Sequence, residues 1–153
     1  YCTNAQVTGI DLSETALRIA GRNAEKNRVE DRCRFLQCDI LHMIPEGEYD
    51  LVLSNPLYIP PDVLAGLEPD VRDYEPRAAL TDGHDGLDFY RAILRNFDEV
   101  LNPGGYFCFE FGMGQGDAVC MLLEQAGYTI VERKRDYRDV ERAVLAQKKR
   151  EDE

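Results

Sequence analysis

The stretch Asp50-Leu-Val-Leu-Ser-Asn-Pro-Leu-Tyr-Ile59 decides how this chain is organised. Leu51 to Ser54 has the composition of a short buried strand, and Asn55-Pro56 must end it, because proline has no N–H to donate to a sheet. The strand is therefore expected to end in a loop at its carboxyl edge. In open α/β sheets that edge is where ligands bind.

Asn55, Pro56 and Tyr58 also offer a specific set of chemical groups. The Asn55 side-chain carbonyl and the backbone carbonyls of Asn55 and Pro56 are hydrogen-bond acceptors, and the Tyr58 ring is a flat apolar surface. Two acceptors beside an aromatic ring suit a planar NH2 group, whose hydrogens need partners while its nitrogen faces an electrophile. A strand followed by an ordinary proline-containing turn explains the same residues, so on their own they leave both interpretations open.

Length and composition indicate one domain spanning residues 1–153. The chain is 44% hydrophobic and 31% charged, ordinary proportions for a soluble globular protein. No apolar run approaches the roughly 20 residues of a membrane span, and no signal-peptide pattern opens the chain. The five cysteines lack paired zinc spacing. These features predict a cytoplasmic protein with no bound metal and no contact with a membrane.

The charge balance bears on the partners of the protein. Formal net charge is −11, and the one cluster of basic residues, Lys148-Lys149-Arg150, is followed at once by three acids. Such a tail is typical of a solvated chain end. Binding to nucleic-acid phosphates rests on clustered Lys and Arg. The sequence therefore argues against a large nucleic-acid footprint.

Two predicted strands early in the chain are each followed by an acid. Gln6 to Ile10 is rich in β-formers and leads into Asp11, and Arg32 to Cys38 leads into Asp39. Between them, Glu14 to Asn27 carries apolar residues at helical spacing. With Asn55, three successive strand ends finish in polar residues.

Asp11 has two possible roles. A carboxylate at the tip of such a strand can accept both hydroxyls of a ribose, as in nucleotide-binding α/β folds. It can also help to cap the helix that follows, for which Ser13 is the expected N-cap. His42, beside apolar residues and without a nucleophile or metal partner in the sequence, is predicted to be structural.

The rest of the chain continues the alternation of helices and strands. In order we expect a long loop at 58–85, a helix at 87–101, a stop and turn at 102–105, a strand at 106–111, a helix at 117–126, and strands at 128–134 and 143–147 joined as a hairpin. The long loop is of the length that is usually functional. Gly112, Gly114 and Gly116 do not fit the dinucleotide fingerprint, and a tight strand-to-helix turn explains them.

A family resemblance runs in order through nearly all of the chain. The matching blocks are Val7-Thr-Gly-Ile-Asp-Leu-Ser-Glu14, Ala20 to Asn27, Ser54-Asn-Pro-Leu-Tyr-Ile59, Tyr74-Glu-Pro-Arg-Ala-Ala-Leu80, Asp85-Gly-Leu-Asp-Phe-Tyr90, Gly114-Gln-Gly116, and Arg135-Asp-Tyr137 with Glu141-Arg142. In these the chain resembles the release-factor glutamine methyltransferases (the HemK/PrmC family). The Asn-Pro-x-Tyr signature is shared with enzymes that methylate adenine and guanine amines, whereas the Glu75-Pro76-Arg77 block is more selective for the glutamine enzymes.

The resemblance implies an α/β fold, the Rossmann-like sheet of class I methyltransferases, mostly parallel with a C-terminal antiparallel hairpin. It implies S-adenosyl-L-methionine as cofactor, with Asp11 on the ribose and Asp39 and Ile40 beside the adenine. The implied cofactor-binding residues are Asp11, Leu12, Asp39, Ile40 and Asn55. Those implied to bind the substrate are Asn55, Pro56, Leu57, Tyr58, Glu75, Pro76 and Arg77, of which Asn55, Pro56 and Tyr58 would be catalytic.

The chain departs from the family pattern in two places. Leu57 stands where the family usually has a second proline, which leaves both carbonyl acceptors in place. The chain also begins at what would be the second core strand, so the first strand, its glycine-rich cofactor loop and the next helix are missing. That strand normally lies between the strands at 7–11 and 51–54, and without it neither has its hydrogen-bonding partner on that side.

The resemblance implies methylation of a glutamine side-chain amide in a peptide chain release factor. One alternative is an N-methyltransferase acting on exocyclic amines of adenine or guanine in RNA or DNA, which would use the same Asn-Pro-x-Tyr residues. The other is a catalytically incomplete fragment, because the glycine-rich loop is missing. The sequence leaves the oligomeric state open.

Overall fold

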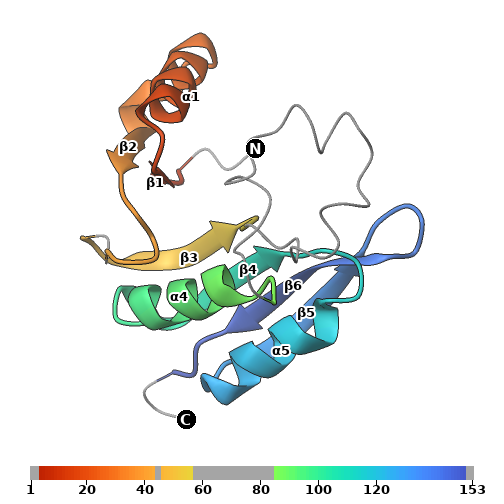
Figure 1. Ribbon diagram of the computed structural model, residues 1–153. Helices are drawn as coiled ribbons and strands as arrows, with labels where there is room; N and C mark the ends of the chain where they lie inside the picture. The colour runs from red at the N-terminus through yellow and green to blue at the C-terminus, as the bar shows by residue number, and fades with distance from the viewer. Residues whose placement is uncertain (1–3, 44–45, 57–84, 151–153) are drawn as a thin grey trace. The chain divides into compact units, whose positions relative to one another are not determined.

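The computed structural model describes residues 4–43, 46–56 and 85–150, which are the coloured parts of the chain in Figure 1. Contacts divide the chain into two units, Tyr1–Met43 and Ile44–Glu153, and each is described by itself. Strands and helices alternate along both units, so the predicted α/β class is confirmed. The prediction of one domain over the whole chain stays a prediction.

In the first unit, two parallel strands are joined through a helix. β1 (Val7–Asp11) and β2 (Cys33–Gln37) pair in parallel along their full lengths. Between them lie α1 (Glu14–Lys26) and one turn of 3-10 helix, η1 (Glu30–Arg32). The predicted strands and helix of this region are confirmed, with small shifts at their ends.

Both ends of α1 are closed by local hydrogen bonds. Ser13 Oγ accepts a backbone N–H of the first turn at 3.3 Å, so the predicted N-cap is confirmed. At the other end Val29 N–H donates to the Ala24 carbonyl at 3.0 Å. Arg28 N–H donates to the Glu25 carbonyl, also at 3.0 Å, which completes a Schellman motif. This motif holds Arg28 in a left-handed backbone conformation with φ 55°.

The second unit is built on a four-stranded sheet with strand order β3–β4–β6–β5 (Figure 1). Its strands are β3 (Tyr49–Ser54), β4 (Leu101–Glu110), β5 (Thr129–Arg135) and β6 (Glu141–Gln147). β3 is parallel to β4, and β6 is antiparallel to both β4 and β5. β5 therefore runs in the direction of β3 and β4, so these three strands have their carboxyl ends at one edge of the sheet.

The strand pairing agrees with the predicted topology. β5 and β6, the last two strands of the chain, form the expected antiparallel hairpin. Among the described residues β1 pairs with β2 alone and β3 pairs with β4 alone, so no described strand joins the two sheets. The resemblance expects the family's first core strand to pair with both β1 and β3, and no described strand does so.

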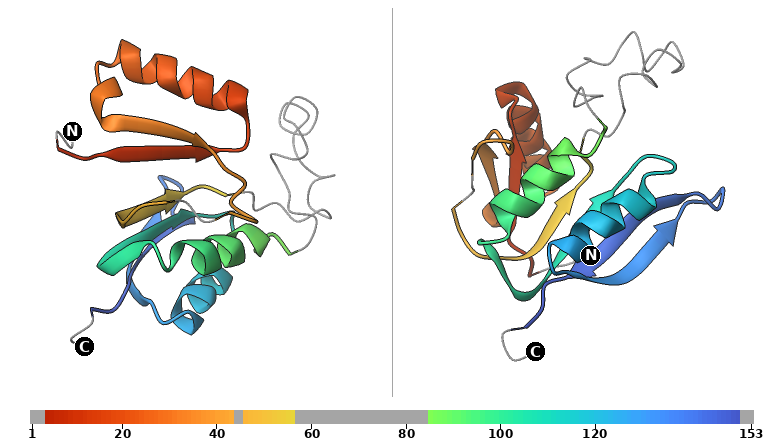
Figure 2. Two further views of the ribbon diagram at one scale, coloured as in Figure 1. Left: turned by 90° about the vertical axis from the view of Figure 1, so that its left-hand side faces the viewer. Right: turned by 60° about the horizontal axis from the view of Figure 1, so that its bottom comes forward.

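Two helices, α4 (Asp88–Phe97) and α5 (Gly116–Gln125), cover the same face of the four-stranded sheet (Figures 1 and 2). Because side chains alternate along a strand, every second residue faces these helices, and Val52 and Phe109 are buried there. The Phe109 ring meets the Tyr90 ring of α4 edge-on, with 5.4 Å between centroids. Each such side chain stabilises the fold by about 1.5–3 kcal/mol through burial.

The opposite face of β3 is open to solvent. Leu51 and Leu53 point away from the helices and are 51% and 74% exposed. They lie on the strand whose second edge has no partner among the described residues. Two exposed leucines beside an unpaired strand edge form an apolar surface that is unusual for a folded protein.

The prediction that one helix spans 87–101 was wrong at its end. α4 ends at Phe97, and Leu101 is already the first residue of β4. Leu101 continues the apolar spacing of the helix, which caused the error. It is buried instead in a strand pair with Tyr49.

The predicted stop and turn at 102–105 lies inside β4. Leu101 and Tyr106 pair with β3 residues on either side of Asp50, so residues 102–105 bulge out opposite a single residue. Asn102 Nδ2 donates to Asp50 Oδ1 at 2.9 Å across this bulge. The turn chemistry was therefore identified correctly, but it interrupts a strand instead of preceding one.

Candidate active site

Asn55 and Pro56 directly follow β3 at the carboxyl edge of the sheet. The last pair in the parallel ladder joins Ser54 to Phe109, so the strand ends before the proline, as predicted. Asn55 is exposed and Pro56 is buried. A buried proline after a paired strand fixes the direction of the backbone, while the exposed amide of Asn55 is accessible to a ligand.

Five residues of the predicted substrate site lie outside the described residues. They are Leu57, Tyr58, Glu75, Pro76 and Arg77. Their predicted roles stay predictions.

Glu110, the last residue of β4, was not predicted as a site residue from the sequence. Continuing the register by one residue sets it beside Asn55, on the neighbouring strand about 4.8 Å away. Its side chain is exposed, and its backbone carbonyl accepts the Tyr90 hydroxyl at 2.8 Å. Glu110 could have been found by the same signal as Asp11 and Asp39, an acid at the end of an apolar strand.

The glycines after β4 form the tight strand-to-helix turn that the sequence predicted. Gly112 N–H donates to Gln115 Oε1 at 3.0 Å, and Gln115 N–H donates to the Gly112 carbonyl at 3.1 Å. Gly114 has φ 85°, a conformation that favours glycine. These hydrogen bonds and the left-handed backbone of Gly114 close the turn.

Asp11, in the first unit, lies at the carboxyl end of β1. Its Oδ1 accepts the Ser13 N–H at 2.7 Å, so this carboxylate does help to cap α1. Among the described residues no hydrogen bond or ion pair engages Oδ2. Leu12 beside it is 65% exposed. A free carboxylate oxygen next to an exposed apolar side chain fits the hydroxyls and carbon face of a ribose.

Parallel pairing brings Asp39 to the same edge as Asp11, because Cys38 N–H donates to the Asp11 carbonyl at 3.1 Å. Asp39 Oδ1 accepts the Leu41 N–H at 3.0 Å, and Oδ2 lies 3.0 Å from Nδ1 of His42, which must donate to it. The His42 hydrogen bond, followed by that of Leu41, holds the pKa of Asp39 below its usual value. Since both oxygens of Asp39 are engaged, its predicted role is to border a base, not to bind hydroxyls.

The structure thus groups some of the predicted residues and leaves others apart. Asp11, Leu12, Asp39 and the half-buried Ile40 belong to one strand edge of the first unit, whereas Asn55 and Pro56 belong to the second unit. Within the described residues no group of three or more His, Cys, Asp or Glu is arranged to hold a metal ion. No helix in the described part of the chain has the length and apolarity to cross a membrane.

A family model described as a methyltransferase domain matches residues 2–147. Curated relatives named release factor glutamine methyltransferase are also similar. The one from Geobacter sulfurreducens is 40% identical over 141 residues, covering 92% of this chain and 49% of the relative. That of Clostridium acetobutylicum is 39% identical (95% and 52% covered), and that of Caulobacter vibrioides 42% (94% and 50%). The chain spans about half the length of these relatives.

Solved structures with a similar fold include a methyltransferase from Pyrococcus furiosus, with a TM-score of 0.70 at 20% identity over 97% of this chain and 65% of that one. Another is a 1,6-didemethyltoxoflavin-N1-methyltransferase from Burkholderia thailandensis with S-adenosylhomocysteine bound. Its TM-score is 0.60 at 20% identity, over 94% of this chain and 61% of that one. At these identities the likeness concerns the fold alone.

Proposed function

The chain belongs to the methyltransferase-domain family, and we propose that within it this protein methylates the side-chain amide nitrogen of a glutamine in a peptide chain release factor. Its fold is the class I methyltransferase fold expected from the sequence. The relatives named for this activity share 39% to 42% of their aligned residues with this chain.

The observation that carries the proposal is the position of Asn55. It is exposed, and it directly follows a strand that pairs along its length with the centre of a sheet. The Asn55 side-chain carbonyl and the neighbouring backbone carbonyls can accept both hydrogens of a planar NH2 group. A glutamine side chain ends in such a group.

The proposed cofactor is S-adenosyl-L-methionine, which when bound supplies an electrophilic methyl group. The residues of the first unit fit its nucleoside part. Oδ2 of Asp11 would accept the ribose hydroxyls, with Leu12 against the carbon face. Asp39 and Ile40 would border the adenine, because they lie at the same strand edge.

The residues of this chain would act mainly by positioning. An amide nitrogen is a poor nucleophile because its lone pair is delocalised into the carbonyl. Hydrogen bonds from both N–H groups to Asn55 and Pro56 would raise the electron density on nitrogen and direct it toward the methyl group. The methylated nitrogen becomes acidic and can release its proton afterwards, so a strong base is not required.

The replacement Asn55→Ala in the natural protein tests this role. Turnover should fall by about a hundredfold, the scale of losing one preorganised hydrogen bond in an active site, while cofactor affinity changes little. Single-turnover kinetics and calorimetry measure the two quantities. Asn55→Asp, which keeps an acceptor oxygen, is the matched control and should retain more turnover than the alanine variant. Equal losses of turnover and cofactor affinity would refute the assigned role.

The substrate class needs its own experiment. Transfer of a labelled methyl group from S-adenosyl-L-methionine is measured with release factor, RNA and DNA as acceptors. We expect label in the protein at a glutamine. Label in adenine or guanine instead would identify the protein as a nucleic-acid amine methyltransferase.

A third experiment addresses the chain 1–153 on its own. Calorimetry with S-adenosyl-L-methionine shows whether these residues bind the cofactor without a glycine-rich loop. An absence of binding would mean that this stretch alone is catalytically incomplete, whatever the activity of the natural protein.

A further inference from the structure

The turn of the β5–β6 hairpin lies at the same end of the sheet as Asn55, where the parallel strands have their carboxyl ends. β5 runs parallel to β3 and β4, so the turn that follows it is at the carboxyl edge of all three strands. The last contact of β4 with β6 is the hydrogen bond from Phe111 N–H to the Arg142 carbonyl at 2.9 Å. At about 3.3 Å per residue the hairpin continues roughly 10 Å past this point.

One carboxylate organises the turn from inside. Asp136 Oδ1 accepts the backbone N–H groups of Arg138 at 2.8 Å and Val140 at 3.1 Å. Its Oδ2 accepts Arg142 Nε at 3.0 Å, and the backbone of Asp136 pairs with Val140 at 2.8 Å. Asp139 takes the left-handed conformation, φ 61°, that completes this type of three-residue turn. The tip therefore has one defined shape.

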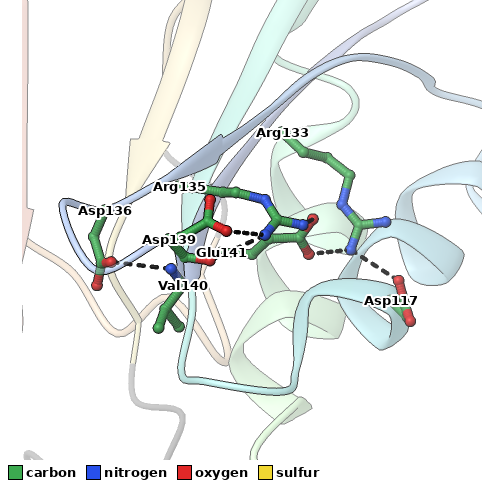
Figure 3. Close-up of polar contacts among 7 residues, drawn as sticks. All are labelled: Asp117, Arg133, Arg135, Asp136, Asp139, Val140 and Glu141. Atoms are coloured by element: carbon green, nitrogen blue, oxygen red, sulfur yellow. Dashed lines mark hydrogen bonds and ion pairs between the residues drawn. The ribbon is translucent and has the colours of Figure 1, made fainter.

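Ion pairs hold the base of the hairpin to α5 (Figure 3). Arg133 donates to Asp117 Oδ1 at 2.8 Å and also to Glu141 across the two strands. Nη2 of Arg135 lies 3.6 Å from Oε1 of Glu141. At Gly116 a Cβ atom would lie 2.8 Å from Glu141 Oε2, so glycine leaves the space that this network occupies. Gly116, Arg135 and Glu141 belong to sequence blocks shared with the family, whereas Arg133 and Asp117 do not.

The turn of the hairpin, held by these contacts, presents two side chains to solvent. Tyr137 is fully exposed. Arg138 is exposed, and among the described residues no hydrogen bond or ion pair engages its guanidinium. Tyrosine and arginine are, with tryptophan, the residue types enriched among side chains that carry binding energy in protein interfaces. A rigid turn lowers the entropy cost of binding through them.

We propose that Tyr137 and Arg138 are a docking element for the protein that carries the methylated glutamine, an inference that rests on the proposed function. β5 is three strand spacings from β3, about 14 Å. A standard interface covers about 800 Å² per partner, a patch that reaches from Asn55 to the hairpin tip. The partner surface would offer an apolar contact for the ring and a carboxylate for the guanidinium.

A nucleic acid fits this surface less well. Residues 129–147 contain five Lys or Arg against four Asp or Glu in a chain of net charge −11. Arg133, Arg135 and Arg142 are already paired with carboxylates. Phosphate binding needs several free cations on one surface, so we assign the tip to a protein partner.

The test compares two substrates of the natural protein. Steady-state methylation is measured with a peptide chain release factor and with a short peptide containing its glutamine, for the unmodified protein and for the Tyr137→Ala/Arg138→Ala variant. We expect KM for the release factor to rise at least about tenfold with kcat unchanged, and the peptide kinetics to stay the same. Met121→Ala, which truncates an exposed apolar residue on α5, is the matched control and should leave both substrates unaffected.

The possible outcomes separate this inference from the proposed function. If the unmodified protein methylates neither substrate, the proposed function fails. If it methylates both and the double variant behaves as the unmodified protein does, the docking role is overturned while the function stands. Loss of activity on the peptide as well would mean that the hairpin supports the fold, which also overturns the proposal.

Discussion

Arg28 ends α1 with a left-handed backbone, φ 55°, at the position where α5 has Gly127 with φ 89°. A residue with a side chain pays roughly 1 kcal/mol in this conformation. Arg28→Gly should therefore raise the free energy of unfolding by about 1 kcal/mol, measured by urea denaturation. The control Arg22→Gly, in the interior of the same helix, should lower it by about 1 kcal/mol. A loss of stability in both variants would show that the Arg28 side chain contributes more than its backbone strain costs.

Glu110 gives a second test at this scale. If its carboxylate faces the substrate amide beside Asn55, Glu110→Gln should lower kcat/KM about tenfold, the scale of one hydrogen bond to a charged group. The melting temperature should not change, because the side chain is exposed. Glu124→Gln on the exposed surface of α5 is the control. Unchanged activity in Glu110→Gln would remove this residue from the site.

Single residues also show how far the sequence could be interpreted. Asp11 could be placed at a strand tip because it follows a β-rich segment, and the structure finds it there, capping α1 through one oxygen. The hydrogen bond between Asp39 and His42 was not predicted. It depends on the turn after β2, which brings the ring back toward the strand end, and the sequence gives no period for that turn.

The hairpin allows a pH prediction at the scale of an element. Hydrogen bonds from Arg142, Val140 and Arg138 lower the pKa of Asp136. A lowered folded-state pKa adds stability above the unfolded value of about 3.9, and this is lost as pH falls through the folded-state pKa. The amide resonances of Arg138 and Val140 should therefore shift together below pH 4, with a midpoint under the usual Asp value.

The matched variants are Asp136→Asn and Asp139→Asn. The first should abolish the transition at both amides, because the titrating group is gone. The second should keep it, since the Asp139 carboxylate is 85% exposed and lies outside the hydrogen bonds of the turn. A midpoint at or above the ordinary Asp value would contradict the assigned contacts.

Elements with a clear period were predicted better than their boundaries. α1, β1, β2 and the C-terminal hairpin follow from spacing, capping and turn residues alone. The end of α4 did not, because Leu101 satisfies both the helical spacing and the alternation of β4. Long-range pairing with Tyr49 decides between them, and a local pattern carries no information about that partner.

For the whole molecule, the sequence predicted the order of elements and the strand ends at which Asp11, Asp39 and Asn55 lie. It predicted no helix or strand for the segment that contains Tyr58 and the Glu75-Pro76-Arg77 block, because that segment has no helical or strand period. The division of the described strands into two sheets agrees with the absence of a first core strand, which only the family resemblance implied. Periodicity in a sequence identifies the strands that the sequence contains. It carries no information about a partner strand outside that sequence.

The last prediction concerns the open face of β3. Leu53 is 74% exposed and Leu51 is 51% exposed beside an edge with no described partner. The chain 1–153 alone should therefore self-associate, and Leu53→Lys should shift it toward monomer in sedimentation experiments without loss of stability.

Curated relatives are about twice as long as this chain. If additional residues cover this face in the natural protein, the same substitution there should lower the melting temperature by several degrees, because it buries a charge. A monomeric chain 1–153 with no response to Leu53→Lys would contradict the first expectation, and an unchanged melting temperature in the natural protein would contradict the second.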